Sequence, residues 1–142
     1  MRLPACEKDE SMLQRLLGIS DKSFDGVERP PARTFKEHCR AGEVFVDDSL
    51  TPCAFAIVID RGGPYIWSIA VVSGLRKNGI GSTLLKEIED YYRGLASATV
   101  QLTCRIENWQ AQRVYLKMGY RVVRVVPRYY GFEDGLLMRR VL

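Results

Sequence analysis

The sequence is poor in the residue types that bind transition metals. It has one histidine among 142 residues, and its four cysteines include no C-x-x-C pair. A zinc site needs a full set of cysteine and histidine ligands, so we expect no bound metal. We interpret the cysteines as reduced thiols of a cytoplasmic protein, because disulfides are rare in reducing compartments. The residues concerned are His38, Cys6, Cys39, Cys53 and Cys104.

Long hydrophobic runs are also absent. Residues 1–7 lack the apolar core of a signal peptide, and nowhere do about 18 apolar residues follow one another. We therefore expect neither export nor a membrane span. Blocks of basic residues are missing too, apart from Arg139–Arg140, although the net charge is +4. A nucleic-acid binder usually has a stronger basic stripe, so the sequence disfavours a nucleic-acid partner.

The overall composition is ordinary for a globular protein, with 46% hydrophobic and 27% charged residues. These fractions exclude the disordered and fibrous classes. A chain of this length corresponds to about one domain, and no repeat, low-complexity tract or linker divides it. We therefore expect residues 1–142 to form a single domain, present as a monomer or a homodimer.

Hydrophobic periodicity predicts a mixed α/β (α+β) fold. We expect an edge strand at 2–6, a helix that ends at Gly18, a loop over 19–33 and a weaker helix over 34–40. The strand over 65–72 is nearly continuous in apolar residues, as in a central strand covered on both faces. The other predicted elements are strands over 43–47, 53–60, 100–106, 120–126 and 136–141 and helices over 82–93 and 109–118.

A glycine-rich turn follows this central strand and opens a helix. In the turn, Arg76-Lys77-Asn78-Gly79-Ile80-Gly81, two glycines separated by one residue let the backbone take φ > 0 and approach a ligand closely. The first N–H groups of the helix behind it have no partner within the helix, which suits an anion such as pyrophosphate. Without further motifs, a tight strand-to-helix connection explains the same glycines.

Two well-known phosphate motifs do not fit this turn. A P-loop needs lysine after its second glycine, and Ile80 stands there. A dinucleotide-binding fingerprint needs a third glycine or alanine where Leu84 stands, and it normally follows the first strand of the fold.

Three segments together resemble the GNAT acetyltransferases. Arg76-x-x-Gly79-x-Gly81 is similar to their acetyl-CoA pyrophosphate loop, 105–111 to their Asn-x-x-Ala segment and 114–120 to their Leu-Tyr-x-Lys-x-Gly-Phe segment. The resemblance extends over about residues 64–142. It implies a mostly antiparallel central sheet flanked by helices, with acetyl-CoA as the co-substrate.

The same resemblance implies the coenzyme site. The pyrophosphate would be held by the glycine turn and the pantetheine amides by the edge of the central strand, while Tyr115 would return a proton to the departing thiolate. Asn108 is also explained as a helix N-cap, and Tyr115 as an aromatic residue on a buried helix face. The residues implied for coenzyme binding are Ile69, Val71, Arg76, Lys77, Asn78, Gly79, Ile80, Gly81, Ser82, Asn108 and Tyr115.

The tail of the chain resembles one branch of the family. Residues 127–138 are similar to a Tyr-Tyr-x-x-(Gly)-Glu-Asp segment of protein N-terminal acetyltransferases, notably the branch that acetylates the N-terminal alanine of a ribosomal protein. The resemblance implies that the acceptor is a protein or peptide N-terminus. An ordinary hairpin turn explains the same residues without a ligand. The substrate-binding residues implied are Tyr129, Tyr130, Glu133 and Asp134.

One position departs from that branch. Its fifth strand commonly carries a glutamate as general base, and Thr103 stands at that position, where it cannot take a proton at neutral pH. An α-amine has a reference pKa of about 7.7 to 8.0, so roughly a tenth is already neutral at pH 7, whereas a lysine is almost fully charged. A relay through Glu107, Asp134 or a water molecule is the alternative.

Several alternatives therefore remain open at the sequence level. The acceptor is a protein N-terminus, or a small amine such as a polyamine, an amino acid or an aminoglycoside. A protein that binds acetyl-CoA but has lost catalysis also agrees with Thr103. An acetylated Cys104 is disfavoured, because strand alternation points it away from Thr103 and no histidine lies nearby in the sequence to activate it.

Overall fold

The computed structural model describes residues 1–24 and 28–142. Within these residues a single sheet of seven strands has the order β1-β2-β3-β4-β5-β7-β6. All neighbouring pairs are antiparallel except β4 and β5, which run parallel. The strands are β1 (Arg2–Leu3), β2 (Glu43–Val46), β3 (Ala54–Asp60), β4 (Pro64–Val71), β5 (Thr99–Arg105), β6 (Arg121–Val126) and β7 (Gly135–Val141). The predicted mixed, mostly antiparallel fold is confirmed.

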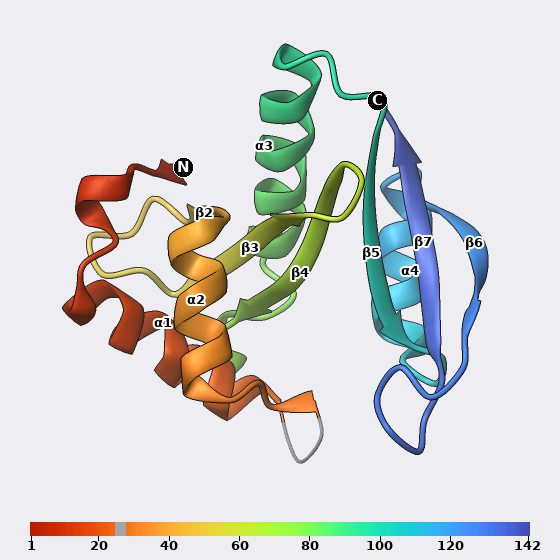
Figure 1. The fold of residues 1–142 in the computed structure, drawn as a ribbon, viewed down its shortest axis with the longest axis horizontal. Coiled ribbons are helices and arrows are strands. Elements are labelled where there is room, and N and C mark those ends of the chain that lie inside the picture. Colours follow the sequence, from red (N-terminus) through yellow and green to blue (C-terminus); the bar gives the residue numbers. More distant parts are fainter. Residues whose placement is uncertain (25–27) are drawn as a thin grey trace.

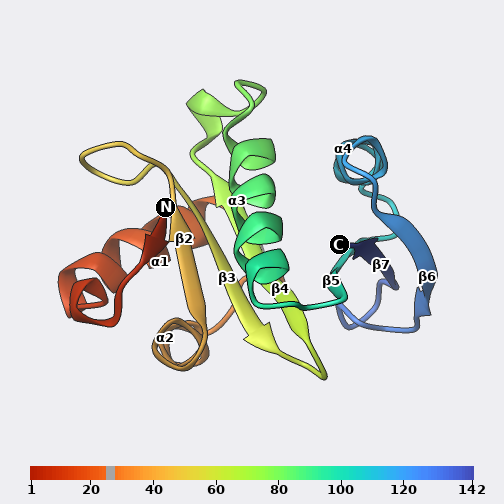
Figure 2. The same ribbon diagram turned by 90° about the horizontal axis from the view of Figure 1, so that it is seen from above.

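The helices cover the two faces of the sheet differently. The helices are α1 (Glu10–Ser23), α2 (Ala32–Ala41), α3 (Ile80–Gly94) and α4 (Trp109–Lys117). The first two pack on one face of the β1–β4 half, and α3 and α4 lie on the opposite face (Figures 1 and 2). The face of β5, β7 and β6 turned away from α4 therefore carries none of these four helices.

Two apolar cores follow from this arrangement. One lies between α1, α2 and the sheet and includes Leu13, Phe35 and Phe55, all fully buried. The other lies beneath α3 and α4, where Leu84, Ile88 and residues of β5 and β7 pack together. Burial of this apolar surface is the dominant stabilising contribution to the fold.

The sheet opens at its centre. β4 and β5 pair only at Tyr65 with Gln101 and at Ile66 with Leu102, after which the two strands diverge (Figure 1). Beyond Ile66, β4 remains paired with β3 on its other side, so one edge of β4 is left without a strand partner among the described residues. This unpaired edge leads directly into the glycine turn.

Two predicted boundaries are wrong. The first helix does not end at Gly18 but continues to Ser23, because Ile19 and Ser20 are buried against the rest of the fold. Burial there outweighs the roughly 1 kcal/mol that glycine costs in a helix interior. Residues 19–23 of the predicted loop are therefore helical, and residues 25–27 of that loop lie outside the described part of the chain.

The predicted first strand is also shorter than expected. Pairing is confined to Arg2–Leu3, and the chain then forms a short 3-10 turn over Ala5–Glu7. Over the described residues, none of the helices combines the length and apolar character that crossing a membrane requires.

Candidate functional site

The glycine turn forms an unusual backbone at the start of α3. Lys77 and Gly79 both have positive φ, 69° and 78°, so the chain passes twice through the left-handed region before the helix begins. Gly79 is the N-cap, and no side chain caps the helix. The backbone N–H groups of Ile80, Gly81 and Ser82 consequently have no acceptor among the described residues. They form a set of donors at the positive end of the helix dipole.

The second glycine is not required by packing within the protein. A Cβ placed on Gly81 would contact only the Cγ2 of Val71, at 3.8 Å, and one placed on Gly79 would meet nothing within 4 Å. Gly79 is explained by its positive φ, whereas Gly81 leaves open space in front of the free N–H groups. This space and these donors fit a diphosphate group.

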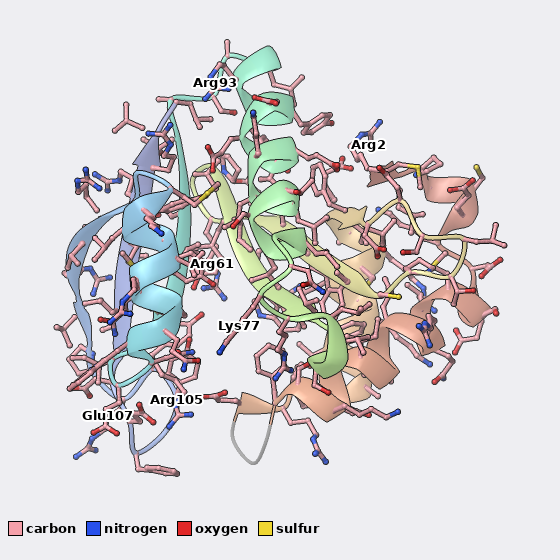
Figure 3. The ribbon with its side chains drawn as sticks, turned by 180° about the vertical axis from the view of Figure 1, so that it is seen from behind. Arg2, Arg61, Lys77, Arg93, Arg105 and Glu107 are labelled. Carbon is pink, nitrogen blue, oxygen red and sulfur yellow. The ribbon has the colours of Figure 1, made fainter. Side chains whose placement is uncertain are left out.

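The two basic residues of the turn have different roles. Arg76 points back into the fold, where its Nε donates to the carbonyl of Val71 at 3.0 Å and its Nη2 to the hydroxyl of Ser23 at 3.3 Å. It therefore fixes the turn against β4 and α1. The Lys77 side chain instead points from the turn toward the half of the molecule that contains α4 (Figure 3). Lys77 is the better placed of the two to contact an anion.

The edge of β4 supplies the second part of the predicted coenzyme site. Ile69 and Val71 pack their side chains against the core beneath α3, which leaves their backbone along the unpaired edge. An extended chain of amides can bind such an edge as an added strand does. The residues present thus fit a ligand with a diphosphate end and an amide-containing arm.

The predicted N-cap of α4 is confirmed. The side chain of Asn108 accepts a hydrogen bond from the backbone N–H of Ala111 at 3.1 Å. Its role in coenzyme binding stays a prediction. Glu107, just before it, is exposed, and its side chain has no hydrogen bond or ion pair with any described residue (Figure 3). The structure therefore does not bring Glu107 into contact with the other predicted catalytic residues.

Tyr115 lies on the buried side of α4. Its ring centroid is 5.9 Å from that of Tyr120, and it packs against the core beneath α3 and α4. Burial, and to a lesser extent the neighbouring Cys104, raise the pKa of the Tyr115 phenol well above its usual value. The hydroxyl therefore keeps its proton at neutral pH, as a proton donor must.

Four side chains form a connected chain of hydrogen bonds on the opposite face of the sheet. Tyr65 donates to the Oγ1 of Thr103 at 2.6 Å, and its oxygen lies 2.7 Å from the hydroxyl of Tyr129. Because the proton of Tyr65 is already used, Tyr129 donates to Tyr65. Arg61 donates to Tyr129 at 3.2 Å, and its guanidinium lies 4.2 Å above the Tyr65 ring. We call Arg61, Tyr129, Tyr65 and Thr103 the hydroxyl chain.

Two further contacts fix Thr103 in place. The hydroxyl of Tyr130 donates to the backbone carbonyl of Thr103 at 3.1 Å. A Cβ on Gly135 would lie 2.7 Å from the Thr103 Cγ2 and 2.8 Å from the Tyr129 Cβ, so only glycine fits beneath them. The structure thus brings Thr103, Tyr129 and Tyr130 together, and the substrate-binding role of the two tyrosines stays a prediction.

The two predicted acidic residues have partners of their own. Glu133 accepts from the Nε of Arg105 at 2.8 Å, and Arg105 also pairs with Glu28 at 2.7 Å. The Asp134 carboxylate accepts from the backbone N–H of Arg128 at 2.9 Å and so holds the β6–β7 loop. Arg105, the last residue of β5, therefore connects the β6–β7 loop to the segment before α2.

Sequence reasoning missed Arg61, Tyr65 and Glu28. Tyr65 was treated as part of an apolar strand, although a tyrosine at the start of such a strand is a signal that its hydroxyl needs a partner. Its proximity to Thr103 depends on the register of β4 against β5, which the sequence does not reveal.

The remaining candidates are not placed for catalysis. Burial raises the pKa of the Cys104 thiol to about 11, so it is protonated at neutral pH and unsuited to be an acetylated nucleophile. His38 packs edge-on against Trp67, with ring centroids 4.4 Å apart, and burial followed by the charge of Arg61 lowers its pKa. His38 is thus a half-buried residue of α2 that packs against Trp67 of β4.

Comparison with known proteins agrees with this geometry. Residues 13–120 match the acetyltransferase (GNAT) family. The chain is 33% identical over 135 residues to an uncharacterized N-acetyltransferase of Methanocaldococcus jannaschii, covering 84% of this chain and 86% of that protein. It is 37% identical over 79 residues to an N-alpha-acetyltransferase of Sulfolobus acidocaldarius, covering 52% of this chain and 45% of that protein. This chain thus spans less than half the length of the second relative.

Solved structures share the fold. The ribosomal-protein-S18-alanine N-acetyltransferase of Escherichia coli superposes with a TM-score of 0.82 at 21% identity, covering 94% of this chain and 89% of that one. The structure of the NatC complex bound to Gag peptide and CoA gives a TM-score of 0.81 at 18% identity, covering 100% and 98%. The family match spans most of the chain, and the protein is therefore an acyltransferase that belongs to the GNAT acetyltransferase family.

Proposed function

We propose that the protein transfers the acetyl group of acetyl-CoA directly to the N-terminal α-amine of a protein or peptide. The observation that carries this proposal is the hydroxyl chain, in which Tyr65 joins Thr103 to Tyr129 and no carboxylate takes part. Such a surface can hydrogen-bond a neutral amine but cannot remove a proton from a strongly basic one. It therefore suits an acceptor that is already partly neutral.

The coenzyme would bind where β4 and β5 diverge. The free N–H groups at the start of α3 would hold its diphosphate, Lys77 would add positive charge, and the edge of β4 would hold the amides of the arm. The thioester supplies an activated acetyl group. With the coenzyme held in this way, the thioester lies in a fixed position. Much of the rate gain then comes from positioning the thioester and the acceptor amine against each other.

The reaction then exchanges one bond at the carbonyl carbon, because a carbon–nitrogen bond forms and the carbon–sulfur bond breaks. The neutral amine nitrogen attacks that carbon, the carbon–sulfur bond breaks, and the electron pair leaves with the sulfur. The amine nitrogen loses one proton to solvent, and the thiolate gains one from the phenol of Tyr115, which is then reprotonated by solvent. Burial keeps the phenol of Tyr115 protonated until the thiolate forms.

The choice of an α-amine rests on its proton affinity. At pH 7 roughly a tenth of α-amines are neutral, against roughly one part in a few thousand for a lysine side chain. Because position 103 carries no carboxylate to act as a base, the more than hundredfold difference in the neutral fraction of the two amines acts directly on the rate. Relatives named N-alpha-acetyltransferase support the same acceptor class.

An acceptor screen tests the proposal. The protein is mixed with acetyl-CoA and short peptides that have a free N-terminus, the same peptides with a blocked N-terminus and one internal lysine, or small amines such as spermidine. Mass spectrometry should show one added acetyl group on the free N-termini and none on the blocked peptides. Acetylation of small amines alone would contradict the proposed acceptor, and acetyl-CoA binding without turnover would show a protein that has lost catalysis.

A further inference from the structure

The open face of the β5–β7–β6 half carries three arginines. In the strand register Arg139 lies beside Gln101 and opposite Arg121, and Arg124 lies opposite Leu137. Directly paired residues point to the same side of a sheet, and Gln101 and Leu137 are on the side turned away from α4. None of the described helices covers this side (Figure 2). We call Arg121, Arg124 and Arg139 the arginine face.

The excess positive charge of the protein lies in the part of the chain that contains this face. Residues 109–142 contain seven of the 21 basic residues and only two of the 17 acidic ones, so the excess positive charge of +4 lies in the last quarter of the chain. Both acidic residues are already engaged, Glu133 with Arg105 and Asp134 with a backbone N–H group of its own loop. The arginine face therefore lacks a carboxylate partner within the described residues.

The individual arginines have only neutral partners. Arg139 donates two hydrogen bonds of 3.0 Å to the amide oxygen of Gln101, in the amide orientation that satisfies both groups. Arg121 donates to the carbonyls of Leu116 and Tyr120, at 3.3 and 2.9 Å.

Within the described residues Arg124 has neither a hydrogen bond nor an ion pair. Arg121 and Arg139 start from directly opposite positions on neighbouring strands, and the Arg121 guanidinium turns to the end of α4 while that of Arg139 turns to Gln101. In the part of the chain that the structure describes, no acidic side chain neutralises either charge. A hollow of about 280 Å³ at the end of this strand pair is lined by Arg121 and Arg139 and, from the α4 side, by Arg140, which already pairs with Glu89 at 3.3 Å.

This face continues from the proposed acceptor site. Thr103, Leu137 and Arg124 lie side by side across three neighbouring strands. With strands about 4.8 Å apart, the backbone at Arg124 is about 10 Å from that at Thr103, which is about three residues of extended peptide. At the other end of the site, Arg105 joins the β6–β7 loop to Glu28 before α2 (Figure 3). An acceptor peptide whose amine lies at Thr103 would therefore extend over the arginine face.

We propose that the arginine face binds acidic side chains of the acceptor, at about the third to fifth residue after its N-terminus. This inference rests on the proposed function, because it places the acceptor amine at Thr103. The preferred substrates are then N-termini followed closely by aspartate or glutamate. A peptide is favoured over nucleic acid because the charge of this face is limited to a few arginines that adjoin the acceptor site.

Three peptides test this inference. They share their first two residues and carry glutamate, glutamine or lysine at positions three to five, and kcat and KM are measured for each at low and at physiological salt. An exposed arginine–carboxylate pair contributes roughly two- to fivefold in affinity. With two or three pairs, kcat/KM for the acidic peptide should exceed that for the basic one by about tenfold or more, mainly through KM and less so at higher salt.

Charge reversal gives the decisive comparison. The variant Arg124→Glu/Arg139→Glu should reverse the preference and favour the lysine peptide, with kcat little changed. The single variant Arg124→Gln, which removes no hydrogen bond within the described residues, should reduce the preference and serves if the double variant unfolds. The matched control is Arg113→Glu on the exposed side of α4, on the opposite face of the sheet, which should leave the preference unchanged.

The possible failures are distinguishable. Equal rates with all three peptides, or a preference that the charge-reversed variant leaves intact, would overturn this inference alone. Acetylation of none of the peptides would overturn the proposed function and this inference with it. RNA binding that the double variant abolishes, with no charge preference among peptides, would assign the face to nucleic acid and overturn the peptide assignment.

Discussion

Removing the Tyr65 hydroxyl is the most direct test of the hydroxyl chain. Tyr65 is 4% exposed, and its hydroxyl joins those of Thr103 and Tyr129 by hydrogen bonds. The substitution Tyr65→Phe keeps the ring and removes two short hydrogen bonds. It leaves the Thr103 hydroxyl with one fewer partner in a half-buried position. We expect it to lower the free energy of unfolding by about 1 to 3 kcal/mol.

A double-mutant cycle isolates the interaction between the two residues. Thr103→Val preserves the shape of the side chain and removes the acceptor, at a cost of about 1 to 2 kcal/mol. Once one of the two hydroxyls, that of Tyr65 or that of Thr103, has been removed, removing the second no longer breaks the hydrogen bond between them. The double variant Tyr65→Phe/Thr103→Val should therefore be more stable than the sum of the single effects predicts, by about 0.5 to 1.5 kcal/mol.

Two measurements check this reasoning. Urea denaturation followed by circular dichroism gives the four free energies of unfolding, and steady-state kinetics with a peptide gives kcat and KM. We expect KM for the peptide to rise about five- to tenfold in Tyr65→Phe, the equivalent of about 1 to 1.4 kcal/mol of lost binding. The dissociation constant for acetyl-CoA should not change. Strictly additive stabilities together with an unchanged peptide KM would refute the role assigned to the chain.

Three other substitutions test separate parts of the site and the fold. Gly81→Val should weaken acetyl-CoA binding more than tenfold in calorimetry with an unchanged circular dichroism spectrum, because the new side chain fills the space before the free N–H groups; retained micromolar affinity would contradict this. Tyr115→Phe should lower kcat at least tenfold with little effect on either KM, and a normal kcat would exclude Tyr115 as the proton donor. Asp47→Asn tests how the free energy of unfolding depends on pH. Although burial alone would raise the Asp47 pKa, hydrogen bonds from Ser49, Cys53 and Ala54 lower it overall. The ionised form is thus favoured by folding, and its stabilisation is complete above the unfolded pKa of about 3.9 and is lost as pH falls through the lower folded value. The variant should be less stable by up to about 1 kcal/mol at pH 7, with the difference shrinking in acid; a constant difference from pH 7 to pH 2 would contradict the assignment.

Local signals in the sequence were sufficient for much of the framework. Asn108 was predicted as the N-cap of a helix, and the structure confirms it with a hydrogen bond to Ala111. The glycine turn was predicted between a strand and a helix, and it lies there. Both features depend on a few consecutive residues, so they are determined by local backbone preferences. Gly18 shows the limit of such signals, because burial of the next two residues carries the helix past it.

The chemistry of the acceptor side depends on long-range contacts that the sequence does not reveal. Tyr65 and Thr103 are 38 residues apart and meet only because β4 pairs with β5 in one register. The arginines looked scattered along the chain, yet the pairing of β6 with β7 places Arg121 opposite Arg139. Arg76 was expected to contact phosphate, and the structure turns it toward β4 instead.

The short pairing of β4 with β5 also bears on the folding cooperativity of the molecule. Within the described residues the two halves of the sheet are connected by two residue pairs, the hydroxyl chain, the Arg105–Glu28 ion pair and the core beneath α3 and α4. A ligand seated along the free edge of β4 would contact both halves and bind only when they are docked. At a hundred times its dissociation constant, such a ligand stabilises the folded state by about 2.7 kcal/mol. Saturation with coenzyme should therefore make two partly independent folding units unfold as one.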